Sequence, residues 1–201
     1  MSVAPFSIVA GPAAVYIAAA GAATYPVTGT IANFDSSGGL EKDFTAQSWT
    51  YLGRTEGGVA VQHQQEVKLL GVDQSLYSVK AIRTSIMNRV TFQLADMSLA
   101  SYTKALYNNS VTTPSANIRQ IQLGADVDVT LFMMLVRAPS SQGNGFMHYE
   151  LPVVITMGSP ETRYVRDDKA TLACEYVSLE DTSQSVAANK MGRLVAYNAT
   201  A

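Results

Sequence analysis

The chain has 201 residues, of which 47% are hydrophobic and only 15% are charged, and its formal net charge is -2. A chain of this length buries about 70% of the surface that its unfolded form exposes, so it supports one self-contained hydrophobic core. Its 14 basic and 16 acidic residues form no run of one sign, which argues against a protein that reads nucleic-acid sequence and gives no support to a polybasic membrane anchor. The low charge leaves two alternatives: other subunits cover part of the surface, or Ser, Thr, Asn and Gln keep it soluble.

The N-terminal part of the chain combines an apolar arm with a first strand. Residues 1–12 are apolar, and Pro5 and Pro12 limit regular pairing, so we expect an arm. No Lys or Arg occurs before Lys42, which does not fit a signal peptide, and the interrupting Pro and Gly residues disfavour a membrane-spanning helix. Residues 13–20 are expected to form a strand.

Residues 24–48 form a segment rich in Gly, Ser, Thr and Asp that is longer than the connections usual in compact domains. It carries three separated apolar side chains, Phe34, Leu40 and Phe44. Apolar residues spaced through such a loop indicate packing on a partner or, alternatively, packing on the chain's own domain.

The middle of the chain is patterned as strands. A short strand over residues 49–52 leads into longer ones over residues 59–73, 77–85 and 89–95, with a break expected at residues 86–88. In the last of these, one parity is apolar and the other polar, as a strand with one buried face requires. The apolar positions are Val90, Phe92 and Leu94.

One parity of the first long strand is polar. Its members are Gln62, Gln64, Glu66 and Lys68, and the neighbouring strand adds Lys80 and Thr84. We interpret this set as facing either an internal channel or another subunit, because parity alone does not separate the two.

A helix is predicted directly after these strands. Leu99, Tyr102 and Leu106 recur at the spacing of one helical face. Asp96 or Ser98 is placed to accept hydrogen bonds from the first unpaired amides and so to begin the helix.

The second half of the chain is predicted as further strands. Their ranges are residues 118–123, 127–137, 146–156, 161–165, 170–176 and 193–197, and residues 139–145 form a polar hairpin loop. The run over residues 127–137 is apolar on both faces, so it must be covered on both, by the helix or by another subunit.

The side chains that could act in catalysis or bind a metal form no catalytic or metal-binding motif. The only histidines are His63 and His148, and no zinc or nucleophile motif accompanies them. His63 lies among glutamines and reads as a solvated or interfacial imidazole. His148 alternates with Glu150, which permits acid-base work but favours a cross-strand structural pair. Cys174, the single cysteine, shares its parity with apolar residues and is expected to be buried. We therefore expect no enzyme activity, metal or cofactor.

The order of these strands and the helix, together with several short motifs, is similar to that of a known protein family. A strand pair over residues 67–75 and 79–84 leads into residues 90–99, a strand with an acidic end and a Ser-Leu pair that opens the helix, which closes near Ala105-Leu106. A Tyr-Val-Arg-Asp step at residues 164–167 follows later, as does Gly-Arg-Leu-Val at the end. This pattern resembles the tail tube protein of long-tailed bacteriophages, over about half of the chain.

The resemblance implies a single mostly β domain over residues 1–201, a β-sandwich or open barrel with one flanking α-helix. It implies a structural virion protein of the phage tail, assembled in the host cytoplasm, whose hexameric rings stack into a tube. Other tail proteins would close the tube ends, and DNA would pass without specific binding. No membrane is involved.

In that family an extended loop near the N-terminus contacts the adjacent ring, so the resemblance assigns ring stacking to Phe34, Leu40 and Phe44. The alternative is a non-enzymatic β-sandwich module for binding or virion decoration. The dispersed Tyr and Trp residues count against a sugar-binding module of that kind.

Overall fold

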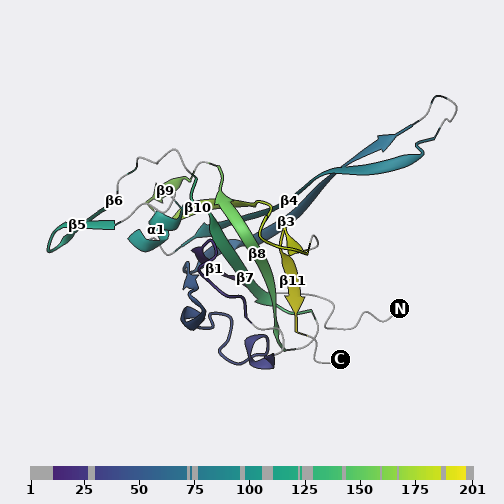
Figure 1. Ribbon diagram of the computed structural model, residues 1–201. Helices are drawn as coiled ribbons and strands as arrows, with labels where there is room; N and C mark the ends of the chain where they lie inside the picture. The colour runs from purple at the N-terminus through teal and green to yellow at the C-terminus, as the bar shows by residue number, and fades with distance from the viewer. Residues whose placement is uncertain are drawn as a thin grey trace.

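The computed structural model describes residues 11–26, 30–71, 73, 77–95, 98–105, 111–121, 123, 129–141, 144–158, 160–166, 168–186 and 189–197. The strands are β1 (Ala14–Ala19), β2 (Thr50–Tyr51), β3 (Thr55–Leu70), β4 (Lys80–Leu94), β5 (Val111–Ser115), β6 (Ile118–Ile121), β7 (Phe132–Pro139), β8 (Phe146–Thr156), β9 (Thr162–Val165), β10 (Asp168–Ser178) and β11 (Arg193–Ala196). The helix is α1 (Leu99–Ala105), and two 3-10 turns are η2 (Ile31–Asn33) and η3 (Thr45–Gln47). A mostly β fold with one helix is therefore confirmed, and it is consistent with a β-sandwich (Figure 1).

Nine of the described strands form one antiparallel sheet. Its main path runs β2-β1-β7-β8-β10-β4-β3, with β11 added to β8 and β9 added to β10. The strands β5 and β6 make a separate two-stranded sheet. Among the described strands, β3 pairs with β4 alone, so one side of β3 is an edge of the sheet.

The strands β3 and β4 form a hairpin that extends well beyond the rest of the molecule (Figure 1). They contain 16 and 15 residues, longer than most strands in globular proteins. The predicted break at residues 86–88 is wrong, because these residues continue β4 opposite residues 63–65 of β3. The register shifts near Gly57-Gly58 and beside Thr84, and between these two points the pairing is regular.

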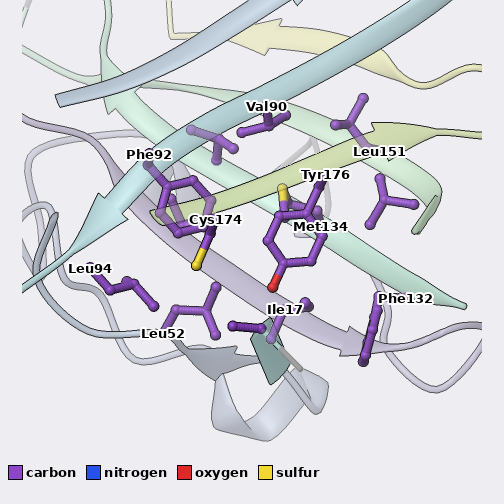
Figure 2. Close-up of a cluster of buried hydrophobic side chains, with 14 of the residues drawn as sticks. Ile17, Leu52, Val90, Phe92, Leu94, Phe132, Met134, Leu151, Cys174 and Tyr176 are labelled. Carbon is purple, nitrogen blue, oxygen red and sulfur yellow. The ribbon is translucent and has the colours of Figure 1, made fainter. Parts of the chain in front are cut away.

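One hydrophobic cluster lies between β4, β7, β8 and β10 (Figure 2). The predicted alternation in β4 is confirmed, because Val90, Phe92 and Leu94 are all buried in this cluster. The ring of Phe92 stacks on that of Tyr176, with centroids 5.9 Å apart. Cys174 is also buried here, and burial raises the pKa of its thiol to about 12, so it remains protonated at neutral pH.

A second cluster covers the opposite face of β1 and β7. It contains Tyr16, Phe44, Trp49, Met133 and Leu135. The expectation that the run over residues 127–137 is covered on both faces holds for residues 132–136, which are buried, but not for Val129 and Leu131, which are exposed. The chain's own loop before β2 covers one face. On the other face, α1 adds Ala105 to the first cluster, and Lys104 lies over the ring of Phe132.

The helix α1 begins as predicted but turns a different face to the core. The hydroxyl oxygen of Ser98 accepts a hydrogen bond from the backbone N–H of Ser101 at 3.1 Å, which is an N-cap contact. Leu99 is exposed and Tyr102 is half-buried, while Ser101 and Ala105 are buried. Tyr102 packs against the first hydrophobic cluster, whereas Leu99 does not, so only part of the predicted stripe faces the core. Asp96 and Leu106 lie outside the described residues.

Candidate functional site

The projecting part of the β3–β4 hairpin presents two different faces. We call residues 65–70 and 80–85 the outer hairpin; their side chains are almost all exposed. Directly opposed residues of an antiparallel pair share a face, so the register assigns each side chain. The predicted polar set lies on one face of β3, with Gln62, Glu66 and Lys68 exposed and Gln64 half-buried.

The two predicted residues of β4 differ in their setting. Lys80 is exposed and lies opposite Leu70, so it joins the polar face near the tip. Thr84 is exposed at the register shift, where its hydroxyl donates to the backbone oxygen of Glu66 at 3.2 Å. This hydrogen bond stabilises the register shift in the pairing of β3 with β4. Whether the polar face lines a channel or contacts a subunit stays a prediction.

The other face of the outer hairpin is the more apolar one, with Val67, Leu69 and Ala81. The register also places Gln65 and Arg83 on this face and Ile82 on the polar face, opposite Lys68. Val67 and Leu69 are 46% and 63% exposed, and Leu69 lies opposite Ala81. The alternation connects this face to Val61, which packs against the hydrophobic cluster at the base of the hairpin. One face of the hairpin is thus core at its base and exposed at its outer end, an arrangement that leaves apolar surface in water.

Arg89 on β4 is paired within the chain. Its guanidinium lies 3.2 Å from the carboxylate of Glu175 on the neighbouring strand β10. His63 faces Asn88 across the hairpin, with Nδ1 2.7 Å from the Asn88 side-chain oxygen. His63 is exposed, as a solvated or interfacial imidazole would be.

The loop before β2 folds back on its own domain. Phe34 and Phe44 are buried, and Leu40 is half-buried against the second cluster. This corrects the expectation for Phe34 and Phe44: the domain's own packing uses these rings, so they are not exposed for contact between rings. The sequence pattern of spaced apolar residues is the same in both situations, which is why it did not separate them.

Two residues of the sheet hold this loop. The hydroxyl of Tyr16 donates to the backbone oxygen of Lys42 at 2.8 Å, and Arg137, which the sequence analysis missed, makes further bonds. Arg137 lies in β7 and is 0% exposed. Its guanidinium donates to three backbone oxygens of the loop: from Nη1 to Asn33 at 2.5 Å, from Nε to Gly39 at 3.2 Å and from Nη2 to Asp35 at 3.3 Å. It also stacks over the ring of Phe146, 3.9 Å from the centroid. The one signal in the sequence is a lone charge that ends an apolar strand.

His148 is the direct cross-strand partner of Arg137. Nη1 of Arg137 donates to His148 Nε2 at 2.8 Å, and the imidazole is 0% exposed. The prediction of a cross-strand structural pair is confirmed, with Arg137 and not Glu150 as the partner. Burial, with a smaller contribution from the Arg137 charge, lowers the pKa of His148 to about 3, so the ring is neutral.

We expect the free energy of unfolding to fall as the pH drops below about 6.5. The unfolded chain binds a proton at the ordinary histidine pKa of 6.5, whereas folded His148 binds it only near pH 3. The contribution of neutral His148 is therefore complete above pH 6.5 and is lost as the pH falls toward 3, at up to about 1.4 kcal/mol per pH unit. Urea unfolding at a series of pH values measures this.

The variant His148→Gln isolates that contribution. Glutamine keeps an oxygen acceptor for Arg137 but does not titrate in this range. Its unfolding free energy should decline less steeply between pH 6.5 and pH 3 than that of the unmodified protein. Equal slopes in the two proteins would show that His148 does not remain neutral in the folded state.

No protein-family model matches the sequence, and no curated protein matches it significantly. Within the described ranges, no helix has the length and hydropathy needed to cross a bilayer.

Proposed function

We propose that the chain is a structural virion protein whose subunits join through the β3–β4 hairpin into rings, and that these rings stack as a phage tail tube. The observation that carries the proposal is the hairpin itself, with a 16-residue edge strand whose outer end exposes Val67 and Leu69. The tube, the hexameric ring and the tail location are supported by the sequence resemblance.

The edge of β3 supports assembly because it offers a row of backbone donors and acceptors. A long unpaired strand edge is a template for pairing with another chain, and monomeric proteins usually shorten, twist or cover such edges. Among the described strands nothing covers the outer side of β3. Pairing with a strand of the next subunit continues the sheet, and a closed ring of subunits removes the edge altogether.

The apolar face of the outer hairpin supports a contact with a different surface of the next subunit. The helix α1 and the β5–β6 sheet lie on the opposite side of the molecule from the hairpin tip (Figure 1). Both carry exposed apolar side chains, namely Leu99, Val111 and Ile118. A contact between two different surfaces of one chain is head-to-tail, and such contacts close into rings or continue as helical filaments.

The polar face then becomes the candidate channel lining. Gln62 and Gln64 are neutral, while Glu66, Lys68 and Lys80 carry charges on the same face of the hairpin and leave one net positive charge per subunit. A lining with so few charges retains DNA phosphates only weakly. The passage of DNA follows from the resemblance and is part of the proposal.

The test is to place charge on one face of the hairpin at a time. The variant Val67→Asp with Leu69→Asp puts two carboxylates on the apolar face, where desolvation in a subunit contact makes them costly. Negative-stain electron microscopy and light scattering should then detect only single subunits. The unmodified protein should form rings or tubes.

The matched control is Gln62→Asp with Gln64→Asp. It adds the same charge to the opposite face of the same strand, and assembly should persist. If the Val67/Leu69 variant still assembles, then the apolar face is not part of the interface. Monomers or dimers of the unmodified protein under all conditions would contradict the tube and favour the binding or decoration module.

A further inference from the structure

A groove lies at the root of the β3–β4 hairpin, where the hairpin leaves the sheet beside β8 and β11 (Figure 1). Its volume is about 590 Å³, many times the roughly 30 Å³ that one water takes in the liquid. Three segments supply its apolar lining: Val61 and Ile86 of the hairpin, Tyr149 and Leu151 of β8, and Met191 and Leu194 at the start of β11.

The walls of the groove are fixed by contacts within the chain. The side-chain amide of Asn88 donates to the backbone oxygen of Met191 at 2.9 Å, which ties the hairpin to the loop before β11. The backbone N–H of Asn88 donates to the hydroxyl of Ser178 at 2.9 Å, at the end of β10. Arg193 pairs with Glu150 of β8, with Nε 2.5 Å from Oε2. The groove is therefore preorganised, which lowers the cost of filling it.

The apolar side chains of the groove are only partly covered. Leu151 is buried at the floor, whereas Leu194 is 54% exposed. Val61, Ile86 and Tyr149 are half-buried. An apolar occupant would remove this surface from water, which is favourable in proportion to the area covered.

Residues 1–10, the part of the predicted N-terminal arm that lies outside the described residues, have the composition that such a groove accommodates. Seven of the ten are apolar and none is charged. Segments that remain unfolded in water have the opposite composition, with few apolar and many charged residues, so this arm needs cover. Phe6 and Ile8 flank Ser7, and in an extended chain they share one side. Pro5 disfavours a helix at this point.

The arm is attached within reach of the groove. Gly11 lies against Pro139, because a Cβ on Gly11 would be 2.9 Å from Pro139 Cγ. Pro139 pairs with Phe146 at the start of β8, and Tyr149 in the groove is three residues, or about 10 Å, further along that strand. Ten extended residues span up to about 33 Å. A short tether gives an effective concentration of about millimolar, which favours the arm of the same subunit over a second copy.

The charges of the groove fit an arm without basic residues. Arg83 is exposed at the groove, and among the described residues it takes part in no ion pair. Arg193 is neutralised by Glu150, so the lining keeps a positive charge. The first basic residue of the chain is Lys42, well beyond the arm. The exposed β5–β6 sheet of a second copy would instead bring Arg119 to the groove.

We propose that residues 1–10 pack into this groove of their own subunit, with Phe6 and Ile8 between the root of the hairpin and β11. The arm then braces the hairpin against β8 and β11 and covers apolar surface at its root. This contact goes beyond the proposed assembly, because it lies within one subunit.

Cross-linking of the full chain tests the position of the arm. Ile8→Cys with Leu194→Cys is treated with a short bis-maleimide, and the buried thiol of Cys174 should not react. We expect a link between the two new thiols in a chain that still migrates as a monomer on a denaturing gel. The matched control is Ile8→Cys with Ile118→Cys. Ile118 is 57% exposed, similar to Leu194, but lies in β6 on the other side of the molecule, so no such link should form (Figure 1).

Amide hydrogen exchange tests the contact without new thiols. Residues 2–10 should exchange at least about tenfold more slowly than in a synthetic peptide of the same sequence. Ile8→Asp should abolish this protection, because a carboxylate is costly in an apolar groove, and it alters no residue of the folded core. Ser7→Asp is the matched control: it places the same charge on the other side of the arm and should keep most of the protection.

Exchange at the peptide rate in the unmodified protein would overturn the proposal, as would equal loss of protection in Ile8→Asp and Ser7→Asp. A cross-link found only between two chains would show that the arm of a second copy fills the groove, and it would overturn the proposal as well. These readouts do not depend on rings, so their failure leaves the assembly proposal standing.

Discussion

Arg137→Met should lower the free energy of unfolding by about 3 kcal/mol or more, because it removes a buried charged group that donates to one buried and three partly buried acceptors. The methionine occupies similar space but donates nothing to the loop oxygens of Asn33, Asp35 and Gly39 or to His148 Nε2. Urea unfolding measures the loss.

A second readout locates the effect of Arg137→Met. Amide hydrogen exchange of residues 30–44 should accelerate more than that of β8 or β10, because the loop loses its attachment to β7 while those strands keep their ladders. Uniform acceleration across the sheet would indicate that Arg137 stabilises the core in general and not the loop in particular.

Arg89→Met is the matched control. Arg89 is partly exposed, and its ion pair with Glu175 lies at the surface. Ion pairs of this kind contribute only about 1 kcal/mol or less, so this variant should remain within about 1 kcal/mol of the unmodified protein. Equal losses in the two arginine variants would contradict the role assigned to the buried guanidinium.

Gly192→Ala should destabilise the protein by about 2–4 kcal/mol, from backbone strain and overpacking together. Gly192 has a φ of +107°, and a Cβ at this position would lie 2.4 Å from the backbone oxygen of Glu150. It would also lie 2.9 Å from a side-chain carbon of Leu151. Because the nearest atom belongs to the backbone of β8, the start of β11 must move away from β8 to make room. Thermal or urea unfolding measures the loss.

Gly58→Ala separates the two causes. Gly58 has a comparable φ of +91°, but nothing lies within 4 Å of the Cβ position. This variant should show the conformational cost alone, about 1 kcal/mol. If Gly58→Ala costs as much as Gly192→Ala, then the close approach of Glu150 contributes nothing, and β11 tolerates displacement.

Elements that depend on local pattern were predictable with good precision. The strand predicted over residues 146–156 coincides with β8, and the one over residues 13–20 contains β1. The alternation of Val90, Phe92 and Leu94 identified a buried face because side chains alternate across any strand. Ser98 was identifiable as a cap because the N-cap contact spans only three residues.

The continuity of β4 was not predictable in the same way. Residues 86–88 contain no strong alternation, so the pattern alone predicts an interruption there. They form a strand because the backbone groups of residues 63–65 in β3 pair with them. The hydrogen-bond ladder of a long hairpin thus overrides a weak local preference.

Whether the apolar side chains of the loop before β2 are buried in the chain's own core was also not predictable from the sequence. Phe34 and Phe44 read equally well as contacts to another subunit and as internal core. Their burial depends on Arg137, whose guanidinium reaches Asn33 across 104 positions of sequence. A contact between residues so far apart in the sequence produces no periodic pattern around either of them, so sequence periodicity does not reveal it.

By itself, the sequence determined the strand-rich class, the buried alternation of β4, the burial of Cys174 and the polar face of Gln62, Gln64, Glu66 and Lys68. These follow from side-chain periodicity and composition, which are local properties of the chain. Only the tertiary structure decided that the hairpin projects from the sheet, that Arg137 is buried against its own loop and that the root of the hairpin, β8 and β11 line one groove. Burial and hydrogen-bond partners depend on which distant segments pack together, and that information exists only once the chain has folded.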